Sequence, residues 1–386
     1  MSDRSNYAAA FQNVYNTLDV QQKQAVDAVK GSVMLVGGPG TGKTEIIATR
    51  IAKILFETNT NPDNILCLAY TDAAVLAMRK RLGTFIGPAA YRVNIFTLDE
   101  LCDDIIGDNI FVFERHSMDK ISALEKVSLY KKLIDAFPKN HPLKRSRGDV
   151  YFEINNLQNL FELMKREGWT SAYINEKINE AGSNTKYEKL RAAAYEYDRF
   201  QQLLLSHNRY ERDDLINPVI KAFEENPDLL KHYQQQFLYI LIDEYQEINA
   251  SQNRFLQLLA GASDIPNIFV AGDDEQHIFS SAESANKHWQ KIILTNNYRS
   301  VQPVLDVAKS LINKKNKESN FQIDTQSKDP IYCNDKWKYV NYADYLPKIK
   351  IYDTGLQEII GIVLQVEKLL QQGVLPAQIG ILFREN

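Results

Sequence analysis

Residues 33–50 constrain the fold more than any other part of the sequence. The segment begins with four apolar residues typical of a buried strand, Val33 to Val36, and leads into a helical pattern with Ile46, Ile47, Ile51 and Ile54 on one side. Between them lies the sequence GGPGTGKT, residues 37–44. Its glycines allow successive backbone N–H groups to point at a phosphate, and the following helix adds the positive end of its dipole. The segment therefore predicts a strand, a phosphate-binding loop and a helix in an α/β fold.

The residue types of this loop predict binding of nucleotide phosphates together with Mg²⁺. Lys43 is expected to reach the outer phosphates, and Thr44 is expected to hold the metal ion. The alternative is a glycine-rich turn in an ordinary α/β protein. The required offsets and both flanking elements are present, which argues against that alternative. The other residues of the loop that are expected to bind the nucleotide are Gly37, Gly38, Pro39, Gly40, Thr41 and Gly42.

Length and composition indicate a globular chain of two or three domains, because it has 386 residues and 24% charged residues. No apolar run approaches the roughly 20 residues of a membrane helix. The N-terminal residues are polar where a secretory signal needs apolar ones, so we expect a cytoplasmic protein without membrane association. The three cysteines are widely spaced and predict neither a disulfide framework nor a zinc site. The net charge of −4 means that any nucleic-acid binding would need a local patch or groove.

The segment before the phosphate loop offers a candidate for base recognition. Asp19 is predicted to be the N-cap of a short helix that leads toward the first strand. A glutamine amide just before such a loop can offer a donor and an acceptor to an adenine edge. Gln22 is our candidate for that contact. The alternative is an ordinary glutamine on a surface helix.

Two further strand ends follow the first helix. An apolar strand is predicted at residues 65–69, and Tyr70 and Thr71 follow it at the start of a helix. A third strand is predicted at residues 93–96, followed by Thr97 and a short helix. Ligands of open parallel sheets bind outside these carboxyl ends of the strands. Tyr70 could therefore stack on a base and Thr71 could contact a phosphate, or the pair could be a surface aromatic and a helix cap.

The pattern becomes helical from residue 103 to residue 233, which predicts an α-helical insertion into the α/β core. The α/β pattern resumes with an apolar strand at residues 237–242, which ends in Asp243 and Glu244. Asp243 is expected to hold Mg²⁺, and Glu244 is expected to orient and deprotonate an attacking water. The alternative is a pair of solvated acids at a strand end. A phosphate loop elsewhere in the same sheet favours the catalytic interpretation.

Two more predicted strands end in candidate phosphate contacts. The strand at residues 268–271 leads to Gln276, which is placed to sense the terminal phosphate. The strand at residues 292–294 leads to Tyr298 and Arg299. Arg299 can supply a planar cationic fork to the transferring phosphoryl group, and Tyr298 can stack on the adenine.

The C-terminal part of the chain is predicted to be mixed. A helix is expected from Val304, followed by a linker or exposed loop at residues 313–320. A strand at residues 348–352, a helix at residues 355–371 and an apolar strand at residues 379–383 complete the pattern. The sequence ends there as if within a domain.

Taken together, these segments resemble the motifs of the UvrD/Rep-type superfamily 1 DNA helicases, in the same order along nearly the whole chain. The resemblance covers the family's glutamine motif at residues 18–26, its phosphate loop at 37–44, its early DNA-contacting motifs at 70–81 and 96–101, its DEFQD element at 243–247, its GDDDQSIY element at 272–279 and its NYRS element at 297–300.

The resemblance implies a domain organisation. A RecA-like P-loop NTPase domain with a parallel sheet would comprise residues 1–102 and 234–296, and a helical insertion similar to the family's 1B subdomain would comprise residues 103–233. Residues 297–386 would begin a second RecA-like domain, similar to the family's 2A subdomain. The family's later motifs, including a second arginine of the ATP site, would lie beyond Asn386.

The resemblance also implies a function: an ATP-dependent DNA helicase or translocase that moves 3′ to 5′ in DNA repair or recombination. The expected substrates are ATP with Mg²⁺, and single-stranded DNA or a junction of single- and double-stranded DNA. The expected protein partners are other DNA-repair proteins. DNA contacts would come from Tyr70, Thr71 and Thr97.

Departures from the family pattern leave two alternatives open. Glu45 replaces a basic residue, residues 97–99 replace a TFH-type contact, and residues 279–284 replace a run with a stacking aromatic and an arginine. Loss of that stacking platform removes about 1–3 kcal/mol of base contact. The sequence therefore supports the ATP site better than the DNA site. The alternatives are the motor part of a helicase–nuclease and a nucleotide-switched DNA-binding module without unwinding activity.

Overall fold

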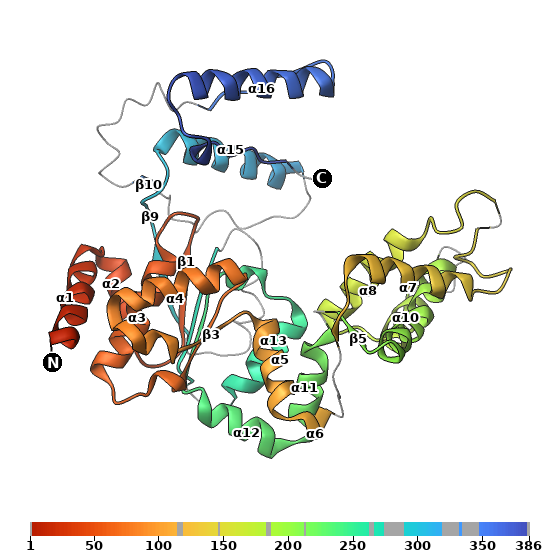
Figure 1. Cartoon of the computed structure of the whole chain (residues 1–386), viewed down its shortest axis with the longest axis horizontal. Coiled ribbons are helices and arrows are strands. Elements are labelled where there is room, and N and C mark those ends of the chain that lie inside the picture. The colour runs from red at the N-terminus through yellow and green to blue at the C-terminus, as the bar shows by residue number, and fades with distance from the viewer. Residues whose placement is uncertain are drawn as a thin grey trace. The chain divides into compact units, whose positions relative to one another are not determined.

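The computed structural model describes residues 2–113, 119–145, 147–182, 187–211, 214–261, 266–273, 289–318, 332–333 and 347–383. The chain forms two compact units (Figure 1). Residues 1–299 make up nearly all of the first unit, and residues 300–328 and 332–386 make up the second. The division between residues 299 and 300 lies close to the expected domain boundary at residues 296 and 297.

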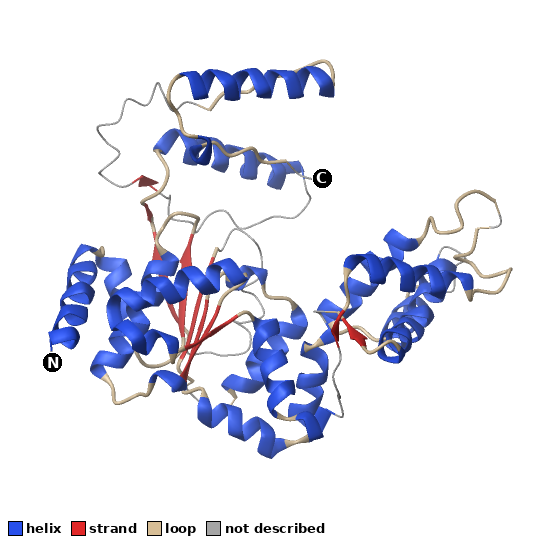
Figure 2. Ribbon diagram, viewed as in Figure 1, coloured by secondary structure: helices blue, strands red, loops and turns tan. Residues whose placement is uncertain are grey.

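The first unit contains a sheet of six strands in the order β3-β2-β6-β7-β1-β8, and each neighbouring pair runs parallel. Figure 2 shows these strands in red with helices around them. The parallel α/β sheet predicted from the apolar runs is therefore confirmed. The strands are β1 (Val33–Gly37), β2 (Ile65–Leu68), β3 (Asn94–Phe96), β6 (Tyr239–Ile242), β7 (Ile268–Gly272) and β8 (Gln290–Leu294).

Both faces of this sheet are buried along β1, β2, β6 and β7, because alternate residues of these strands enter two separate hydrophobic clusters. In β1, Val33 and Leu35 belong to one cluster, and Met34 and Val36 belong to the other. The first cluster is covered by α2 (Val20–Asp27), α3 (Lys43–Glu57) and α4 (Asp72–Ile86), and the second by α5 (Leu98–Asp108), α11 (Ile216–Glu225), α12 (Pro227–Gln236) and α13 (Ala250–Ala260). The helix α1 (Ser2–Thr17) contacts α3 and α4.

A third hydrophobic cluster belongs to the helical insertion. Its centre is a group of buried aromatic rings, in which Tyr130 stacks on Phe200 with centroids 4.2 Å apart and Phe161 packs beside both. This cluster gives the insertion a core separate from the core of the sheet. Its helices are α7 (Ala123–Asp135), α8 (Ile154–Glu167), α9 (Ser171–Glu180) and α10 (Glu188–Ser206).

The third cluster includes residues from a shorter part of the chain than the insertion expected at residues 103–233. Its buried residues extend from Ile121 to Leu204, whereas Ile105, Val219 and Tyr233 belong to a cluster on the sheet. Both ends of the expected insertion therefore cover the sheet, because the apolar faces of α5, α11 and α12 pack against it. We propose that the inserted subdomain extends only from β4 (Asp119–Lys120) to β5 (Arg209–Tyr210), which pair in parallel.

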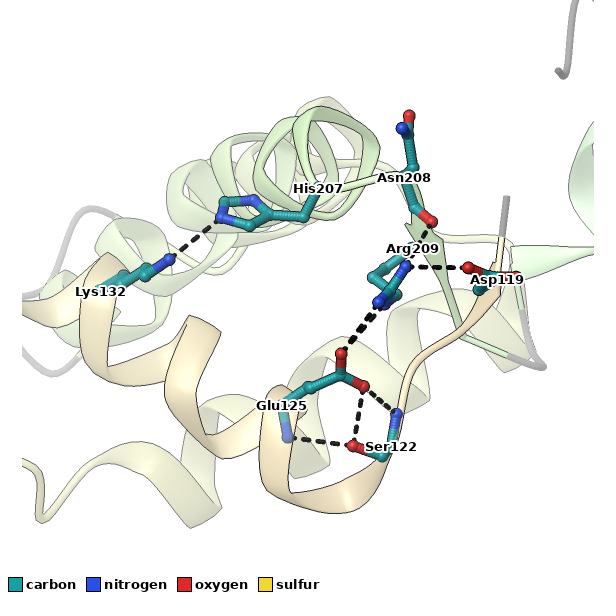
Figure 3. Close-up of polar contacts among 7 residues, drawn as sticks. All are labelled: Asp119, Ser122, Glu125, Lys132, His207, Asn208 and Arg209. Carbon is teal, nitrogen blue, oxygen red and sulfur yellow. Dashed lines mark hydrogen bonds and ion pairs between the residues drawn. The ribbon is translucent and has the colours of Figure 1, made fainter. Parts of the chain in front are cut away.

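Charged contacts at this strand pair join the two ends of the inserted subdomain (Figure 3). The guanidinium of Arg209 lies 3.1 Å from Glu125 Oε1 and 3.2 Å from Asp119 Oδ2. The carboxylate of Glu125 also accepts hydrogen bonds from the backbone and side chain of Ser122 at the start of α7. These bonds, with those from Arg209, lower the pKa of Glu125 to about 2.

The second unit agrees with the sequence prediction at one helix and differs from it in three places. The helix α16 (Gly355–Gln371) is confirmed. The differences are at residues 313–318, 348–352 and 379–383. The helix α15 (Gln302–Glu318) continues through residues 313–318, where a linker was expected, because lysine and glutamate are good helix formers. Residues 348–352 and 379–383 are not strands, so both strand predictions are wrong. Residues 379–383 are apolar and residues 348–351 alternate lysine with isoleucine, but neither segment has a neighbouring strand among the described residues, and Ile351 and Leu382 are almost fully exposed.

Candidate active site

The phosphate loop joins β1 to α3 and needs glycine at two positions. Gly40 has a φ of 84° and Gly42 a φ of 90°, in the left-handed region that side chains avoid. A Cβ at Gly40 would lie 2.7 Å from the Cβ of Arg299, and one at Gly42 would lie 2.9 Å from Nε2 of Gln22. Backbone conformation and close packing therefore both exclude larger residues here.

The Lys43 side chain is buried and turned into this loop. Its Nζ donates to the carbonyl oxygen of Gly37 at 2.8 Å and to that of Gly38 at 3.4 Å. Thr41 Oγ1 donates to the same Gly38 carbonyl at 2.8 Å, which closes the loop on itself. The ammonium group is thus held among backbone groups, in the position from which it can contact phosphate oxygens bound by the loop.

Thr44 and Asp243 meet at the carboxyl ends of the strands. Thr44 Oγ1 donates to Asp243 Oδ2 at 3.0 Å, although the two residues are 199 positions apart in the sequence. Asp243 directly follows β6, and its backbone N–H donates to the carbonyl of Leu68 at 2.9 Å. Burial raises the pKa of Asp243, and the neighbouring Glu244 carboxylate adds to that effect. The hydroxyl and the carboxylate are oxygen ligands of the kind that Mg²⁺ prefers.

Glu244 has a strained backbone and an oriented side chain. Its φ of 51° is unusual for a residue other than glycine and is typical of functional sites. Gln246 Nε2 donates to Glu244 Oε2 at 2.5 Å, and the backbone N–H of Asp273 donates to Gln246 Oε1 at 3.0 Å. Gln246 therefore links the side chain of Glu244, the candidate general base, to the backbone directly after β7. Sequence reasoning assigned Gln246 no role, although it lies in the DEYQE segment.

The phosphate loop, Thr44, Glu244 and Gln246 line one cavity of about 230 Å³. Arg299 reaches it from the segment after β8, so candidates from three separate parts of the chain converge: the phosphate loop, Glu244 and Arg299. Glu45 also lines the cavity and forms an ion pair with Arg81 of α4. The predicted Gln276 lies outside the described residues. The lining residues are Pro39, Gly40, Thr41, Gly42, Lys43, Thr44, Glu45, Glu244, Gln246, Asp273 and Arg299.

The two candidates for adenine binding contact the protein itself. Gln22 Nε2 donates to the Thr41 carbonyl at 3.0 Å, and Gln22 Oε1 accepts from the backbone N–H of Asp19 at 3.1 Å. The Tyr298 hydroxyl donates to Asp19 Oδ2 at 2.5 Å. Burial and this hydrogen bond raise the pKa of Tyr298. Contacts of Gln22 and Tyr298 with a base stay predictions.

The three candidates for DNA binding lie at the carboxyl ends of β2 and β3 but differ in exposure. Tyr70 is 55% exposed, as a stacking platform requires. The hydroxyl of Thr71 caps α4 through the N–H of Ala74 at 3.2 Å, and that of the buried Thr97 caps α5. Tyr70 and Thr71 were expected either to contact DNA or to be a surface aromatic and a helix cap. The exposed ring of Tyr70 is compatible with both alternatives, and the Thr71 hydroxyl forms a helix cap.

Comparison with known proteins identifies the family. Residues 18–293 match the model of the UvrD/REP helicase N-terminal domain. The chain is 31% identical to DNA helicase II of Rickettsia typhi over 80% of this chain and 46% of that protein. It is 30% identical to a probable DNA helicase II homolog of Rickettsia felis over 87% of this chain and 51% of that protein.

A third relative is the ATP-dependent DNA helicase PcrA of Staphylococcus aureus, with 28% identity over 78% of this chain and 40% of that protein. The chain thus spans about half the length of these relatives or somewhat less. In the part of the chain that the structure describes, no helix has the length and apolar character needed to cross a lipid bilayer. The family match covers more than half of the chain and includes the nucleotide loop, both carboxylates and the sheet that positions them, so the chain belongs to the UvrD/REP helicase family.

Proposed function

We propose that this chain is the ATP-hydrolysing motor part of a DNA helicase that moves 3′ to 5′ along single-stranded DNA. The observation that carries the proposal is the hydrogen bond between Thr44 and Asp243 beside the buried Lys43 ammonium. It supports Thr44 and Asp243 as candidate Mg²⁺ ligands beside the phosphate loop. The membership of the UvrD/REP helicase family supports DNA as the polymer on which the motor acts.

The residues around the cavity supply each function that ATP hydrolysis needs. Lys43 binds phosphate oxygens, and Thr44 and Asp243 would hold Mg²⁺, which supplies neutralisation of phosphate charge when bound. Glu244 accepts a proton from water as the water oxygen attacks the terminal phosphorus. The bond from that phosphorus to the oxygen of ADP then breaks, and the products are ADP and phosphate. Arg299 contacts the terminal phosphate, and Gln276, which lies outside the described residues, is predicted from the sequence to contact it as well.

On the DNA side, Tyr70 is the residue that the structure supports best. Its exposed ring lies at the edge of the sheet where ligands of such folds bind, and stacking on a base is worth about 1–3 kcal/mol. Thr71 and Thr97 would add contacts from the N-termini of α4 and α5. The substrate would be single-stranded DNA or its junction with a duplex, in DNA repair or recombination in the cytoplasm, together with other repair proteins.

A second candidate function is a nucleotide-switched DNA-binding module without unwinding. The observation that favours it is the use of the Thr71 and Thr97 hydroxyls as helix caps, which leaves fewer polar groups for DNA. Both functions need the same nucleotide site. They differ in whether DNA accelerates ATP turnover.

Steady-state ATP hydrolysis with and without single-stranded DNA tests the proposal. We expect Mg²⁺-dependent turnover that DNA stimulates, and at least a 100-fold loss in Glu244→Gln, because general-base catalysis contributes about 10²–10⁴-fold. Glu57→Gln on the exposed end of α3 is the matched control and should keep wild-type turnover. Turnover that Glu244→Gln leaves unchanged would refute the assignment. Tight ATP binding with negligible, DNA-insensitive turnover would favour the switched module.

A further inference from the structure

Three consecutive peptide groups of the phosphate loop are held from outside the loop. In a trans peptide the C=O and the following N–H point in opposite directions. Fixing the carbonyls of residues 39–41 therefore also fixes the directions of the N–H groups of residues 40–42. The bonds run from Asn297 Nδ2 to Pro39 O at 2.5 Å, from Tyr298 N to Gly40 O at 2.8 Å, and from Gln22 Nε2 to Thr41 O at 3.0 Å.

Asp19 contacts the residues on both sides of this arrangement. Its Oδ1 accepts from the backbone N–H of Gln22 at 2.8 Å, and its own N–H donates to Gln22 Oε1 at 3.1 Å. Its Oδ2 accepts from the Tyr298 hydroxyl at 2.5 Å and from Asn296 Nδ2 at 3.1 Å. The Asp19 carboxylate thus connects Gln22 of α2, which holds the loop at Thr41, to the segment at residues 296–299.

That segment also determines where Arg299 enters the cavity. The backbone N–H of Arg299 donates to Asn297 Oδ1 at 2.9 Å, and the Asn297 side chain is almost fully buried. Arg299 is therefore placed by the same amide that holds the Pro39 carbonyl. A shift in the loop peptides would move the arginine, and a shift in the segment would turn the loop N–H groups.

We propose that Asp19 is a positioning residue that couples occupancy of the phosphate loop to the segment carrying Arg299. An anion on the loop N–H groups polarises their peptide units and makes the opposite carbonyls better acceptors for Asn297 and Tyr298. Asp19 fixes the position of Tyr298 relative to Gln22, because it is hydrogen-bonded to both residues. Nucleotide binding and order in residues 296–299 therefore favour each other reciprocally. This inference rests on the proposed function.

A purely structural cap is the competing explanation, and one substitution separates the two. The cap needs only Oδ1, whereas Oδ2 is directed at Tyr298 and Asn296. Asparagine caps helices about as well as aspartate, so Asp19→Asn keeps the cap. It removes the charge and places an amide N–H₂ against that of Asn296. Tyr298→Phe removes the same hydrogen bond from the other side and keeps the aromatic ring.

The test is a double-mutant cycle read by calorimetric titration with AMP-PNP and Mg²⁺. We expect each single variant to bind on the order of tenfold more weakly, because hydrogen bonds to charged groups are the stronger ones. The double variant should bind no more weakly than Asp19→Asn alone, since both substitutions remove the hydrogen bond between Asp19 and Tyr298. Tyr15 and Asp27 form a similar pair at the other end of α2, with 2.8 Å between the hydroxyl and Oδ1. The variants Tyr15→Phe and Asp27→Asn are the matched controls and should bind normally.

Hydrogen exchange of the Tyr298 amide supplies a second readout. AMP-PNP with Mg²⁺ should slow this exchange in the wild type and slow it several-fold less in Asp19→Asn, whereas a simple cap would leave the nucleotide-dependent slowing unchanged. If the wild type binds nucleotide and both single variants show the same affinity and the same Tyr298 amide exchange as the wild type, this inference is overturned. Strictly additive effects in the double variant would also overturn it. Neither result would contradict the proposed function. A wild-type chain that binds no nucleotide would overturn the proposed function as well.

Discussion

Replacing Gly40 with alanine tests the packing of the phosphate loop. Its φ of 84° is left-handed, where a side chain costs about 1–2 kcal/mol. The new Cβ would lie 2.7 Å from Arg299 Cβ and 2.8 Å from Asn297 Nδ2, so residues 296–299 must move. That movement breaks the two hydrogen bonds to the Pro39 and Gly40 carbonyls, at about 1 kcal/mol each. The free energy of unfolding of the first unit should therefore fall by about 3–4 kcal/mol.

Urea unfolding followed by circular dichroism measures this loss, and Gly83→Ala is the matched control. Gly83 lies inside α4, and no atom lies within 4 Å of a Cβ added there. Alanine at this position should stabilise the chain by about 0.5–1 kcal/mol, because glycine is unfavourable in a helix interior. The two substitutions thus have opposite predicted signs. A Gly40→Ala chain as stable as the wild type, with normal Mg·ATP affinity, would refute the reasoning.

Three further predictions concern other parts of the chain. Gln246→Leu should lower ATP turnover more than it raises the KM for ATP, because it frees the Glu244 carboxylate; steady-state kinetics measure both. Glu125→Gln should lower stability at neutral pH. Because the pKa of Glu125 is depressed to about 2, the difference from wild type should be complete above pH 4.5 and vanish as pH falls toward 2, as thermal melts would show. Tyr70→Ala should weaken single-stranded DNA binding by about 1–3 kcal/mol in fluorescence anisotropy, while ATP affinity stays unchanged.

The sheet could be predicted from the sequence because its signals are local. Each buried strand is an apolar run, and Thr71, Thr97 and Asn249 mark helix starts directly as N-caps. Asn226 and Pro227 likewise indicate the start of α12 as its cap and first residue, within the region expected to be helical. The sequence could not predict which core α5 and α11 cover, because an amphipathic pattern does not identify the surface against which it packs.

The contacts that complete the candidate site depend on tertiary structure. Asp19 meets Tyr298 across 279 positions, and nothing near either residue predicts that pair. The role of Gln246 likewise becomes visible only when Asp273 is placed beside it. The two strands expected in the second unit did not form. A segment becomes a strand only when a neighbouring strand supplies hydrogen-bond partners, and the local sequence does not show whether such a neighbour exists.

Calorimetric titration of the chain with ATPγS in the presence and absence of Mg²⁺, compared with Lys43→Ala and Asp243→Asn, tests the central claim most directly. The arrangement of Lys43, Thr44 and Asp243 predicts one site per chain. Affinity at that site should fall at least tenfold in Lys43→Ala. The increase of affinity with Mg²⁺ should be lost in Asp243→Asn, because this variant removes the carboxylate charge. Equal affinities in all three chains, with or without Mg²⁺, would contradict the claim that these residues form a Mg·ATP site.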